Sequence, residues 1–474
     1  MLSLFERAVR NPLLLTDSYK VSHWRQYPPG TRSIYSYWES RGGEHPEVTF
    51  FGLQALLRRY LSRPVTHDDV MQARDIYGPH VGPDIFNEDG WMRLLEKHEG
   101  RLPVSIRAVP EGMVVPVRNV MLTIENTDPE FYWLTNYLET ILSQLWYPST
   151  VCTISRAFRQ LIARYLHETG DLAGLMFMLH DFGFRGVSSV ESAAIGGAAH
   201  LVNFRGTDTV VAIPFLLDYY AALADVGLSI PAAEHSTITS WLRENEGLAF
   251  QNMVTQYGSC KAGLYAVVSD SYNIFEACEM WGTRLKDVVM AAPNTLVVRP
   301  DSGTPHVIVV QVIETLDRYF GHQVNEKGFK ILNKVRVIQG DGVDLEEGER
   351  ILEALKVRGW SANNIAFGMG GALLQKMDRD TQKFAIKCSW ADVGGQQRMI
   401  YKDPITDHAK RSKKGRLKLV LRDGVPETVS ETEVGADLLR PVYRDGQILR
   451  EDDFETIRRR AAAGHEAWTW KQTA

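Results

Sequence analysis

Residues 335–343 read VRVIQGDGV, an apolar, β-branched run that stops at the triplet Gly-Asp-Gly (340–342). This pattern predicts a buried strand, and DLEEGERILEALK at 344–356 predicts the helix that follows it. A second glycine cluster, FGMGG at 367–371, comes one strand later. A buried strand does not need a carboxylate between two glycines at its end, whereas a site that holds a sugar or a phosphate against the backbone does. These strand ends therefore indicate both a fold and a site.

The same unit, an apolar strand followed by a polar loop and a helix, occurs four times in succession. Its strand and loop segments are YAVVSD (265–270), TLVVRPDSG (295–303), VRVIQGDG (335–342) and NIAFGMGG (364–371). Four such units in a row predict right-handed crossovers and a parallel sheet. We expect this sheet to close as a parallel α/β barrel, in which the loops at the carboxyl ends of the strands build the site.

The sequences that flank these units have a different pattern. Strand-like pieces such as VSIRAVPEGMVVPV occur before them, and the tail from residue 416 contains short runs separated by Arg-Asp-Gly turns, which predict antiparallel strands. We therefore expect an α/β fold with two discontinuous domains. They are a barrel-like catalytic domain of residues 1–43 and 169–380, and a mixed α+β domain with antiparallel strands of residues 44–168 and 381–474.

The composition argues against several classes of function. The 474 residues carry a formal net charge of -5, which does not indicate nucleic-acid binding. The four cysteines are scattered without a CxxC pair, which argues against a structural zinc site and fits a reducing compartment. The longest apolar stretch, at 210–228, is interrupted by a proline and two aspartates, and Glu6 interrupts the N-terminal segment. We therefore expect no membrane span and no secretion signal, and a cytoplasmic protein.

Three carboxylates follow apolar strands directly, so a parallel sheet would bring Asp270, Asp301 and Asp341 to one edge. Carboxylates there can accept hydrogen bonds from ribose hydroxyls or hold Mg²⁺ through water. The glycines beside them would let backbone N–H groups approach a phosphate, at which a helix starting near residue 371 would point its positive end. Each aspartate could instead be only an N-cap and each glycine only a tight turn. Four consecutive units with this pattern favour a sugar-phosphate site.

Basic and aromatic residues extend this prediction. Arg185, Arg299 and Arg379 could neutralise a phosphate or pyrophosphate through paired hydrogen bonds. The basic run KRSKKGRLK (410–418) fits a phosphate clamp and a solvated loop equally well. For His235, in PAAEHST, a catalytic role and a structural role are about equally supported.

Two further residues fit a flat substrate. Phe182 lies in HDFGFRG, a glycine-containing loop in which an exposed ring can stack on a flat molecule. Asp208, in GTDT, is another carboxylate at the expected edge.

With these residues assembled, the sequence resembles the nicotinamide phosphoribosyltransferase family of type II phosphoribosyltransferases. The resemblance runs from LLTDSYKVSHW (14–24) to KRSKKGRL (410–417) and includes HDFGFRGVSS, NFRGTDT, PAAEHSTITSW, RPDSG, VIQGDGVD and AFGMGGALLQK. It implies a pentosyltransferase of NAD salvage that transfers phosphoribosyl from phosphoribosyl pyrophosphate to nicotinamide. It also implies stimulation by ATP as a co-substrate, a requirement for Mg²⁺ as a cofactor, and a homodimer with shared active sites.

The resemblance implies roles for the residues that contact the pyridine ring and ATP. Phe182 would stack on one face of the ring, and the partner subunit's Tyr19 on the other. Asp208 would accept a hydrogen bond from the carboxamide N–H₂, and Arg185 would contact the carboxamide oxygen and the phosphate region. His235 would be phosphorylated, which couples ATP hydrolysis to turnover.

Roles are also implied for the residues that contact ribose, phosphate and pyrophosphate. Ribose and phosphate would be handled by Arg299, Asp301, Gly340, Asp341, Gly370 and Gly371. Asp270 would lie near the Mg²⁺–pyrophosphate end, with no metal held by protein side chains alone. The basic residues that would reach phosphates across the dimer are Arg379, Lys387 and Lys410.

Three positions differ from the family pattern, which has Ser, Asp and Ser where this chain has Ala385, Asn273 and Met369. The differences bear on affinity, not on the reaction. Nicotinate phosphoribosyltransferase remains an alternative, although Asp208 would repel the carboxylate of nicotinate. A non-catalytic nucleotide-binding or signalling homologue is a second alternative. A barrel aldolase or isomerase would need a lysine, which the strand-end loops between 265 and 371 do not contain.

Overall fold

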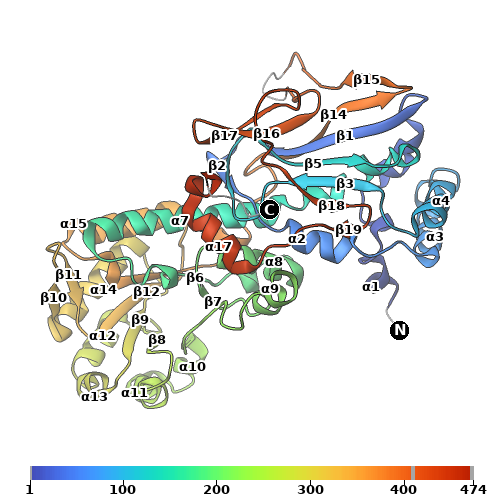
Figure 1. Ribbon diagram of the computed structural model, residues 1–474. Coiled ribbons are helices and arrows are strands. Elements are labelled where there is room, and N and C mark those ends of the chain that lie inside the picture. The colour runs from blue at the N-terminus through green and yellow to red at the C-terminus, as the bar shows by residue number, and fades with distance from the viewer. Residues whose placement is uncertain (1–2, 407–410, 470–474) are drawn as a thin grey trace. The chain divides into compact units, whose positions relative to one another are not determined.

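The computed structural model describes residues 3–406 and 411–469, and its internal contacts divide the chain into two compact units (Figure 1). Unit 1 consists of Met1–Thr153, Asp218–Ala222 and Asp378–Ala474, and unit 2 consists of Ile154–Leu217 and Leu223–Met377. No helix within the described ranges is both long enough and apolar enough to cross a membrane.

Unit 2 contains a six-stranded sheet in which every pair of neighbouring strands is parallel, as the repeated strand–loop–helix units predicted. Its strands, in spatial order, are β7 (Gly206–Thr207), β6 (Leu179–Asp181), β13 (Ile365–Met369), β12 (Val335–Gln339), β9 (Thr295–Arg299) and β8 (Leu264–Val268). A short antiparallel hairpin outside this sheet is formed by β10 (His322–Val324) and β11 (Lys330–Leu332).

The chain at 228–232 joins the two edges of this sheet. Leu228 forms a parallel bridge with Gly206 at one edge, and Ala232 forms one with Ala266 at the other. The sheet is therefore closed into a barrel-like ring, and the predicted α/β fold class is confirmed.

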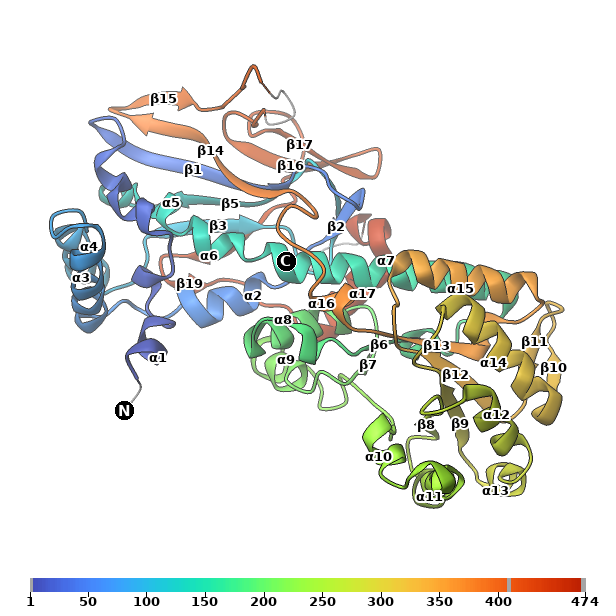
Figure 2. The same ribbon diagram turned by 180° about the vertical axis from the view of Figure 1, so that it is seen from behind.

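Helices follow the strands and cover the sheet (Figure 2), and α14 packs directly on β12. Side-chain caps fix where two of them begin: Asn273 accepts the N–H groups of Phe275 and Glu276, and Asp344 accepts that of Glu347. The helices of unit 2 are α8 (Val190–Leu201), α10 (His235–Thr239), α11 (Glu246–Tyr257), α12 (Ile274–Gly282), α13 (Lys286–Ala291), α14 (Pro305–Phe320), α15 (Leu345–Val357) and α16 (Gly371–Leu374). Two helices include residues of both units, α7 (Trp146–Thr169) and α9 (Ala212–Tyr220).

Unit 1 is built on a seven-stranded sheet whose neighbouring strands are antiparallel. In spatial order they are β15 (Gln396–Met399), β14 (Phe384–Val393), β1 (Thr31–Ser40), β5 (Val120–Asn126), β3 (Val104–Ala108), β18 (Arg440–Arg444) and β19 (Gln447–Ile448). Two smaller antiparallel pairs are β2 (Glu47–Thr49) with β4 (Val114–Pro116) and β16 (Leu417–Arg422) with β17 (Val425–Ser430). The helices of unit 1 are α1 (Leu4–Ala8), α2 (Leu53–Leu56), α3 (His67–Val81), α4 (Glu88–His98), α5 (Leu134–Tyr137), α6 (Glu139–Ser143) and α17 (Phe454–Ala463).

Both Arg-Asp-Gly sequences of the tail form hairpin turns, as predicted. Asp423 and Gly424 connect β16 to β17, and Asp445 and Gly446 connect β18 to β19. All four residues have positive φ angles, between 50° and 83°, which two-residue hairpin turns require at both central positions.

The domain boundaries differ from those expected at the N-terminal end. Residues 1–43 were expected in the barrel-like domain, but β1 pairs with β5 and β14, which places this segment in unit 1. The reason is backbone pairing: β1 is a central strand, and both of its edges are hydrogen-bonded to strands distant in sequence. Residues 154–168 were expected in the mixed α+β domain, but they belong to unit 2, which contains the parallel sheet.

The aromatic ring of Phe182 requires glycine, or a residue nearly as small, at two positions of the barrel. It packs against the interior cluster of Ala266, Val297 and Ile338. A Cβ atom at Gly368 would lie 2.0 Å from Phe182 Cε2, and one at Gly340 would lie 3.1 Å from the same atom. These glycines therefore make room for an aromatic ring against the backbone.

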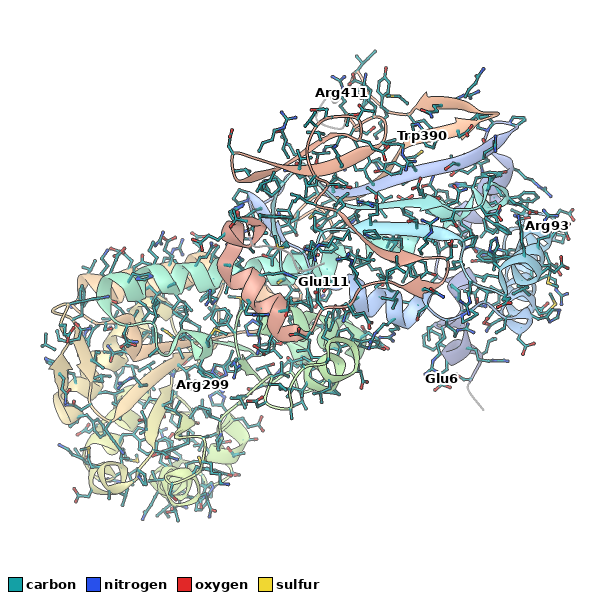
Figure 3. The ribbon with its side chains drawn as sticks, viewed as in Figure 1. Glu6, Arg93, Glu111, Arg299, Trp390 and Arg411 are labelled. Atoms are coloured by element: carbon teal, nitrogen blue, oxygen red, sulfur yellow. The ribbon has the colours of Figure 1, made fainter. Side chains whose placement is uncertain are left out.

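Unit 1 contains a buried carboxylate, Glu111, labelled in Figure 3. It accepts hydrogen bonds from the N–H groups of Gly52 (2.9 Å) and Gln54 (2.6 Å) and from the Tyr220 hydroxyl (3.0 Å). Burial is the main cause that raises the pKa of Glu111 to about 7.

We expect Gly368→Ala to destabilise the protein by about 1–3 kcal/mol or more, because the new methyl group overlaps the Phe182 ring. The measurement is the thermal unfolding midpoint. Gly174→Ala is the control, because a Cβ atom at Gly174 would have no heavy atom within 4 Å. In a Phe182→Ala background, Gly368→Ala should cost much less than it does in the wild type. An equal cost in both backgrounds would show that the overlap with Phe182 is not the cause.

We expect Glu111→Gln to change how stability depends on pH. The folded-state pKa of about 7 lies above the ordinary value of 4.5, so the folded chain holds this proton more tightly. Its contribution to the free energy of unfolding is complete below pH 4.5 and is lost as the pH rises through 7. The stability of the variant relative to the wild type should therefore rise across this range, by up to about 1.4 kcal/mol per pH unit.

Thermal midpoints measured at about pH 5 and about pH 8 test this expectation. Glu96→Gln, at an exposed position on α4, is the control. Parallel pH profiles for the wild type and Glu111→Gln would show that the buried carboxyl group does not titrate in this range.

Candidate active site

A cavity of about 770 Å³ lies at the carboxyl ends of the parallel strands, and all the residues that line it belong to unit 2. Of the six strands of the parallel sheet, all except β8 contribute residues at or just after their carboxyl ends. The predicted site residues that line it are Phe182, Arg185, Asp208, Arg299, Asp301, Gly340, Asp341, Gly370 and Gly371.

Asp270, which follows β8, organises the predicted catalytic residues. Its Oδ1 lies 3.0 Å from His235 Nε2, and its Oδ2 accepts hydrogen bonds from the Asp301 backbone N–H (3.0 Å) and the Ser302 hydroxyl (2.5 Å). Only 4% of the Asp270 side chain is exposed, against 45% for His235. Asp270 therefore holds its neighbours in position, and His235 is accessible.

The second carboxylate of this group, Asp301, faces both basic partners. Its Oδ2 lies 3.1 Å from Arg299 Nη2 and 3.9 Å from His235 Nδ1. The Arg299 Nε is buried and has no hydrogen-bond partner in the described parts of the chain. Arg299 thus retains donor capacity beyond its bond to Asp301, and Figure 3 labels it in unit 2.

The other end of the cavity combines an aromatic ring with an acidic group. Phe182 follows β6, and its backbone N–H donates to the Met369 carbonyl (3.0 Å). Asp208 follows β7, is exposed, and accepts a hydrogen bond from the Ser229 hydroxyl (2.5 Å). Beneath them Asp181 is completely buried, and burial is the main cause that raises its pKa to about 6.

Both oxygens of Asp270 have partners within the protein, His235 on Oδ1 and the Asp301 N–H and Ser302 hydroxyl on Oδ2. Across residues 3–406 and 411–469, no three His, Cys, Asp or Glu side chains are grouped as metal ligands. The carboxylates of Asp208, Asp301 and Asp341 line the cavity.

Seven lining residues were not among the predicted site residues: Phe184, Gly186, Thr209, Gly342, Val343, Ala372 and Lys376. Lys376 lies just after the four-residue helix α16, within the AFGMGGALLQK motif, and is exposed. Lys376 belongs to a quoted motif, but it lies beyond the strand-end loops from which the site residues were predicted. Thr209 is buried and directly follows Asp208. Its position next to a predicted site residue was the only feature of the sequence that indicated it.

Five of the described predicted residues do not line this cavity: His235 and Asp270, which contact its lining residue Asp301, and Tyr19, Arg379 and Lys387. Tyr19 lies in a 3₁₀ helix of unit 1 and is 62% exposed, and Arg379 and Lys387 also belong to unit 1. Burial, with the positive charges of Arg41, Lys402 and Arg379, lowers the pKa of Lys387. Lys410 lies outside the described residues.

The three departures from the family pattern have ordinary surroundings. Asn273 is the N-cap of α12, a position at which asparagine and aspartate serve equally well. Met369 ends β13 and is buried, and Ala385 lies on β14 opposite Glu39 of β1. None of them lines the cavity.

Comparison with known proteins identifies the family. The model described as the nicotinate phosphoribosyltransferase (NAPRTase) family matches residues 177–447, and that of the nicotinamide phosphoribosyltransferase N-terminal domain matches residues 11–106. A relative from Xanthomonas campestris, named nicotinamide phosphoribosyltransferase, is 51% identical over 96% of this chain and 98% of its own. One of the same name from Acinetobacter baylyi is 33% identical over 97% of this chain and 98% of its own.

Solved structures support the fold. Nicotinate-nucleotide pyrophosphorylase from Pyrococcus furiosus has a TM-score of 0.61 at 13% identity, covering 100% of this chain and 99% of its own. Human nicotinic acid phosphoribosyltransferase has a TM-score of 0.57 at 17% identity, covering 96% of this chain and 94% of its own. Since a family model covers more than half of the sequence and a full-length relative is 51% identical, the chain belongs to the nicotinate phosphoribosyltransferase (NAPRTase) family.

Proposed function

We propose that this protein is a nicotinamide phosphoribosyltransferase of NAD salvage. It transfers the phosphoribosyl group of phosphoribosyl pyrophosphate to nicotinamide and releases nicotinamide mononucleotide and pyrophosphate. The observation that carries the proposal is a single cavity with Phe182 and Asp208 at one end and Asp301, Arg299 and the strand-end glycines at the other. The names of the 51% and 33% identical relatives support the amide as substrate.

Recognition of the amide depends on Asp208 and Phe182. The Ser229 hydroxyl uses one acceptor site of the Asp208 carboxylate, and the remaining lone pairs can accept a carboxamide N–H₂. The carboxylate of nicotinate would instead meet a like charge. Phe182 supplies a flat surface, with its ring fixed by the glycine backbone at 340 and 368.

The transfer builds positive charge on the ribose and negative charge on the departing pyrophosphate. Asp301 stabilises the ribose, and Arg299 and Lys376 stabilise the pyrophosphate as its charge develops. The pyridine nitrogen carries no proton, so the chain needs no general base and contributes mainly by positioning. Magnesium bound to the pyrophosphate would neutralise further negative charge, and Asp301 and Asp341 are the residues that would hold it there.

ATP acts through His235 in this proposal. With Nε2–H donating to Asp270 Oδ1, the lone pair of Nδ1 is free to attack the γ-phosphorus of ATP. The P–N bond forms as the bond to the β,γ-bridging oxygen breaks, and ADP leaves with that electron pair. Water later hydrolyses the phosphohistidine. The buried Asp270 fixes the tautomer that this step requires.

We also infer a cytoplasmic homodimer in which Tyr19, Arg379 and Lys387 of one subunit complete the cavity of the other. The lowered pKa of Lys387 among three other cationic groups supports this inference, because a phosphate beside them would remove an unfavourable interaction.

The proposal is tested by offering phosphoribosyl pyrophosphate and Mg²⁺ with either nicotinamide or nicotinate, and measuring the mononucleotide by mass. The wild type should use nicotinamide strongly in preference to nicotinate. Asp208→Asn removes the repulsion, so the ratio of kcat/KM for amide to acid should fall by at least about tenfold. Asp225→Asn, an exposed position outside the cavity, is the control. A wild type that prefers nicotinate would replace the proposed substrate with the acid.

His235→Ala should keep slow transfer but lose its stimulation by ATP, because the phosphoryl acceptor is gone. The measurement is mononucleotide formation and ADP release with and without ATP. His322→Ala is the matched control, since His322 is also paired with an aspartate, Asp317, but lies on the β10 hairpin outside the parallel sheet. Full ATP stimulation in His235→Ala would rule out the phosphohistidine.

A further inference from the structure

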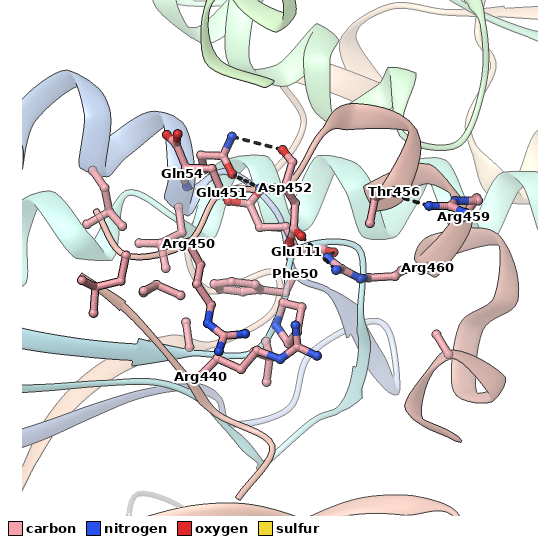
Figure 4. A pocket seen from close by; sticks show the side chains of 18 residues that line it. Phe50, Gln54, Glu111, Arg440, Arg450, Glu451, Asp452, Thr456, Arg459 and Arg460 are labelled. Atoms are coloured by element: carbon pink, nitrogen blue, oxygen red, sulfur yellow. Dashed lines mark hydrogen bonds and ion pairs between the residues drawn. The ribbon is translucent and has the colours of Figure 1, made fainter. Parts of the chain in front are cut away.

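A second large cavity, of about 740 Å³, lies within unit 1 and shares no lining residue with the candidate active site (Figure 4). Its walls come from α2, from the chain that follows β3, and from the C-terminal elements β18 and α17. It is large enough for a nucleotide-sized molecule, since ligand pockets usually have volumes of about 300–1,000 Å³.

Four arginines line this cavity, and two of them have protein partners. Arg460 pairs with Asp452 (Nη2 to Oδ1 2.9 Å), and Arg459 donates to the Thr456 hydroxyl (2.9 Å). The side chains of Arg440 and Arg450 make no hydrogen bond or ion pair with any residue in 3–406 or 411–469, although the backbone of Arg440 pairs with β3. Figure 4 shows the guanidinium groups of Arg440 and Arg450 lying side by side.

The acidic residues of the cavity are already engaged. Glu451 pairs with Arg58 (Oε2 to Nη2 2.7 Å) and Asp452 with Arg460. Glu111 is directed to backbone N–H groups and to a tyrosine hydroxyl, as described above. No carboxylate of the cavity is therefore bonded to Arg440 or Arg450, and the charge of Asp452 only partly offsets the repulsion that Arg440 meets.

Arg440 is partly buried and Arg450 is exposed at the mouth of the cavity. Burial, and then the positive charges of Arg460 and Arg450, lower the pKa of Arg440. Two adjacent guanidinium groups with free donors match the oxygens of a phosphate, which each can bind through paired hydrogen bonds. Apolar side chains supply the rest of the wall, notably Phe50, Leu53, Val109 and Leu449.

We propose that this cavity binds a phosphorylated metabolite of nucleotide size. Arg440 and Arg450 hold its diphosphate group, and the apolar wall contacts its organic part. The ligand supplies the negative charge, because the acidic residues nearby are already paired with other groups. It does not depend on the proposed transferase activity, because it lies in unit 1 and uses none of the residues assigned to that activity.

ADP is the probe, titrated calorimetrically into the full-length protein. The wild type should bind ADP in two classes of site, one of which is lost in Arg440→Gln/Arg450→Gln, with affinity reduced at least about tenfold. Inorganic pyrophosphate should displace ADP from that class, which tests the diphosphate contact. Arg299→Gln, in the active-site cavity, should leave that class unchanged. Nicotinamide turnover is assayed in parallel and should not change in Arg440→Gln/Arg450→Gln.

Arg422→Gln/Arg444→Gln is the matched control, since it removes the same charge from unit 1 at arginines that have carboxylate partners. It should keep both classes. If Arg440→Gln/Arg450→Gln does not fold, Arg440→Lys/Arg450→Lys retains the charge and should weaken the class by about tenfold, through loss of the paired geometry. Equal ADP stoichiometry and affinity in the wild type and the variant would overturn the proposal. A single ADP class that Arg299→Gln abolishes would also overturn it.

Discussion

The register of the parallel sheet is the constraint on which the site depends. Asp181 pairs with both Met369 and Thr207, so the next residue of each strand, Phe182, Gly370 or Asp208, emerges at the same level. The pairing of Val268 with Arg299 brings the loops after β8 and β9 together in the same way. Because side chains alternate along a strand, a slip of one residue in this register would turn a side chain that faces the cavity, such as Phe182 or Asp208, to the other face of the sheet.

Charge is arranged differently in the two cavities. In unit 2, Asp270 is buried but both of its oxygens receive protein donors, so it costs little and holds its neighbours rigidly. In unit 1, Arg440 and Arg450 lack such partners within the described ranges. A buried ion that the protein itself satisfies is part of the framework, whereas a group left unsatisfied defines what a ligand must bring.

The sequence was most informative where local pattern determines structure. The four strand–loop–helix units and the turns at Asp423 and Asp445 depend on residues adjacent in the chain, and all were predicted. The place of β1 was not, because its partners β5 and β14 lie far away in sequence and no local signal selects them. Lys376 was also missed, because it lines the cavity from the end of α16 and not from the loop that follows β13.

The contact between Phe182 and Gly368 also has a consequence for how this sequence can diverge. The two residues are separated by 186 positions in the chain, yet the ring occupies the space that a Cβ atom would need. As long as position 182 is aromatic, position 368 is confined to glycine, and a larger residue at 368 becomes accessible only after the ring is lost. Substitutions at the two positions must therefore occur in a fixed order, and the pair should vary jointly among homologues or not at all.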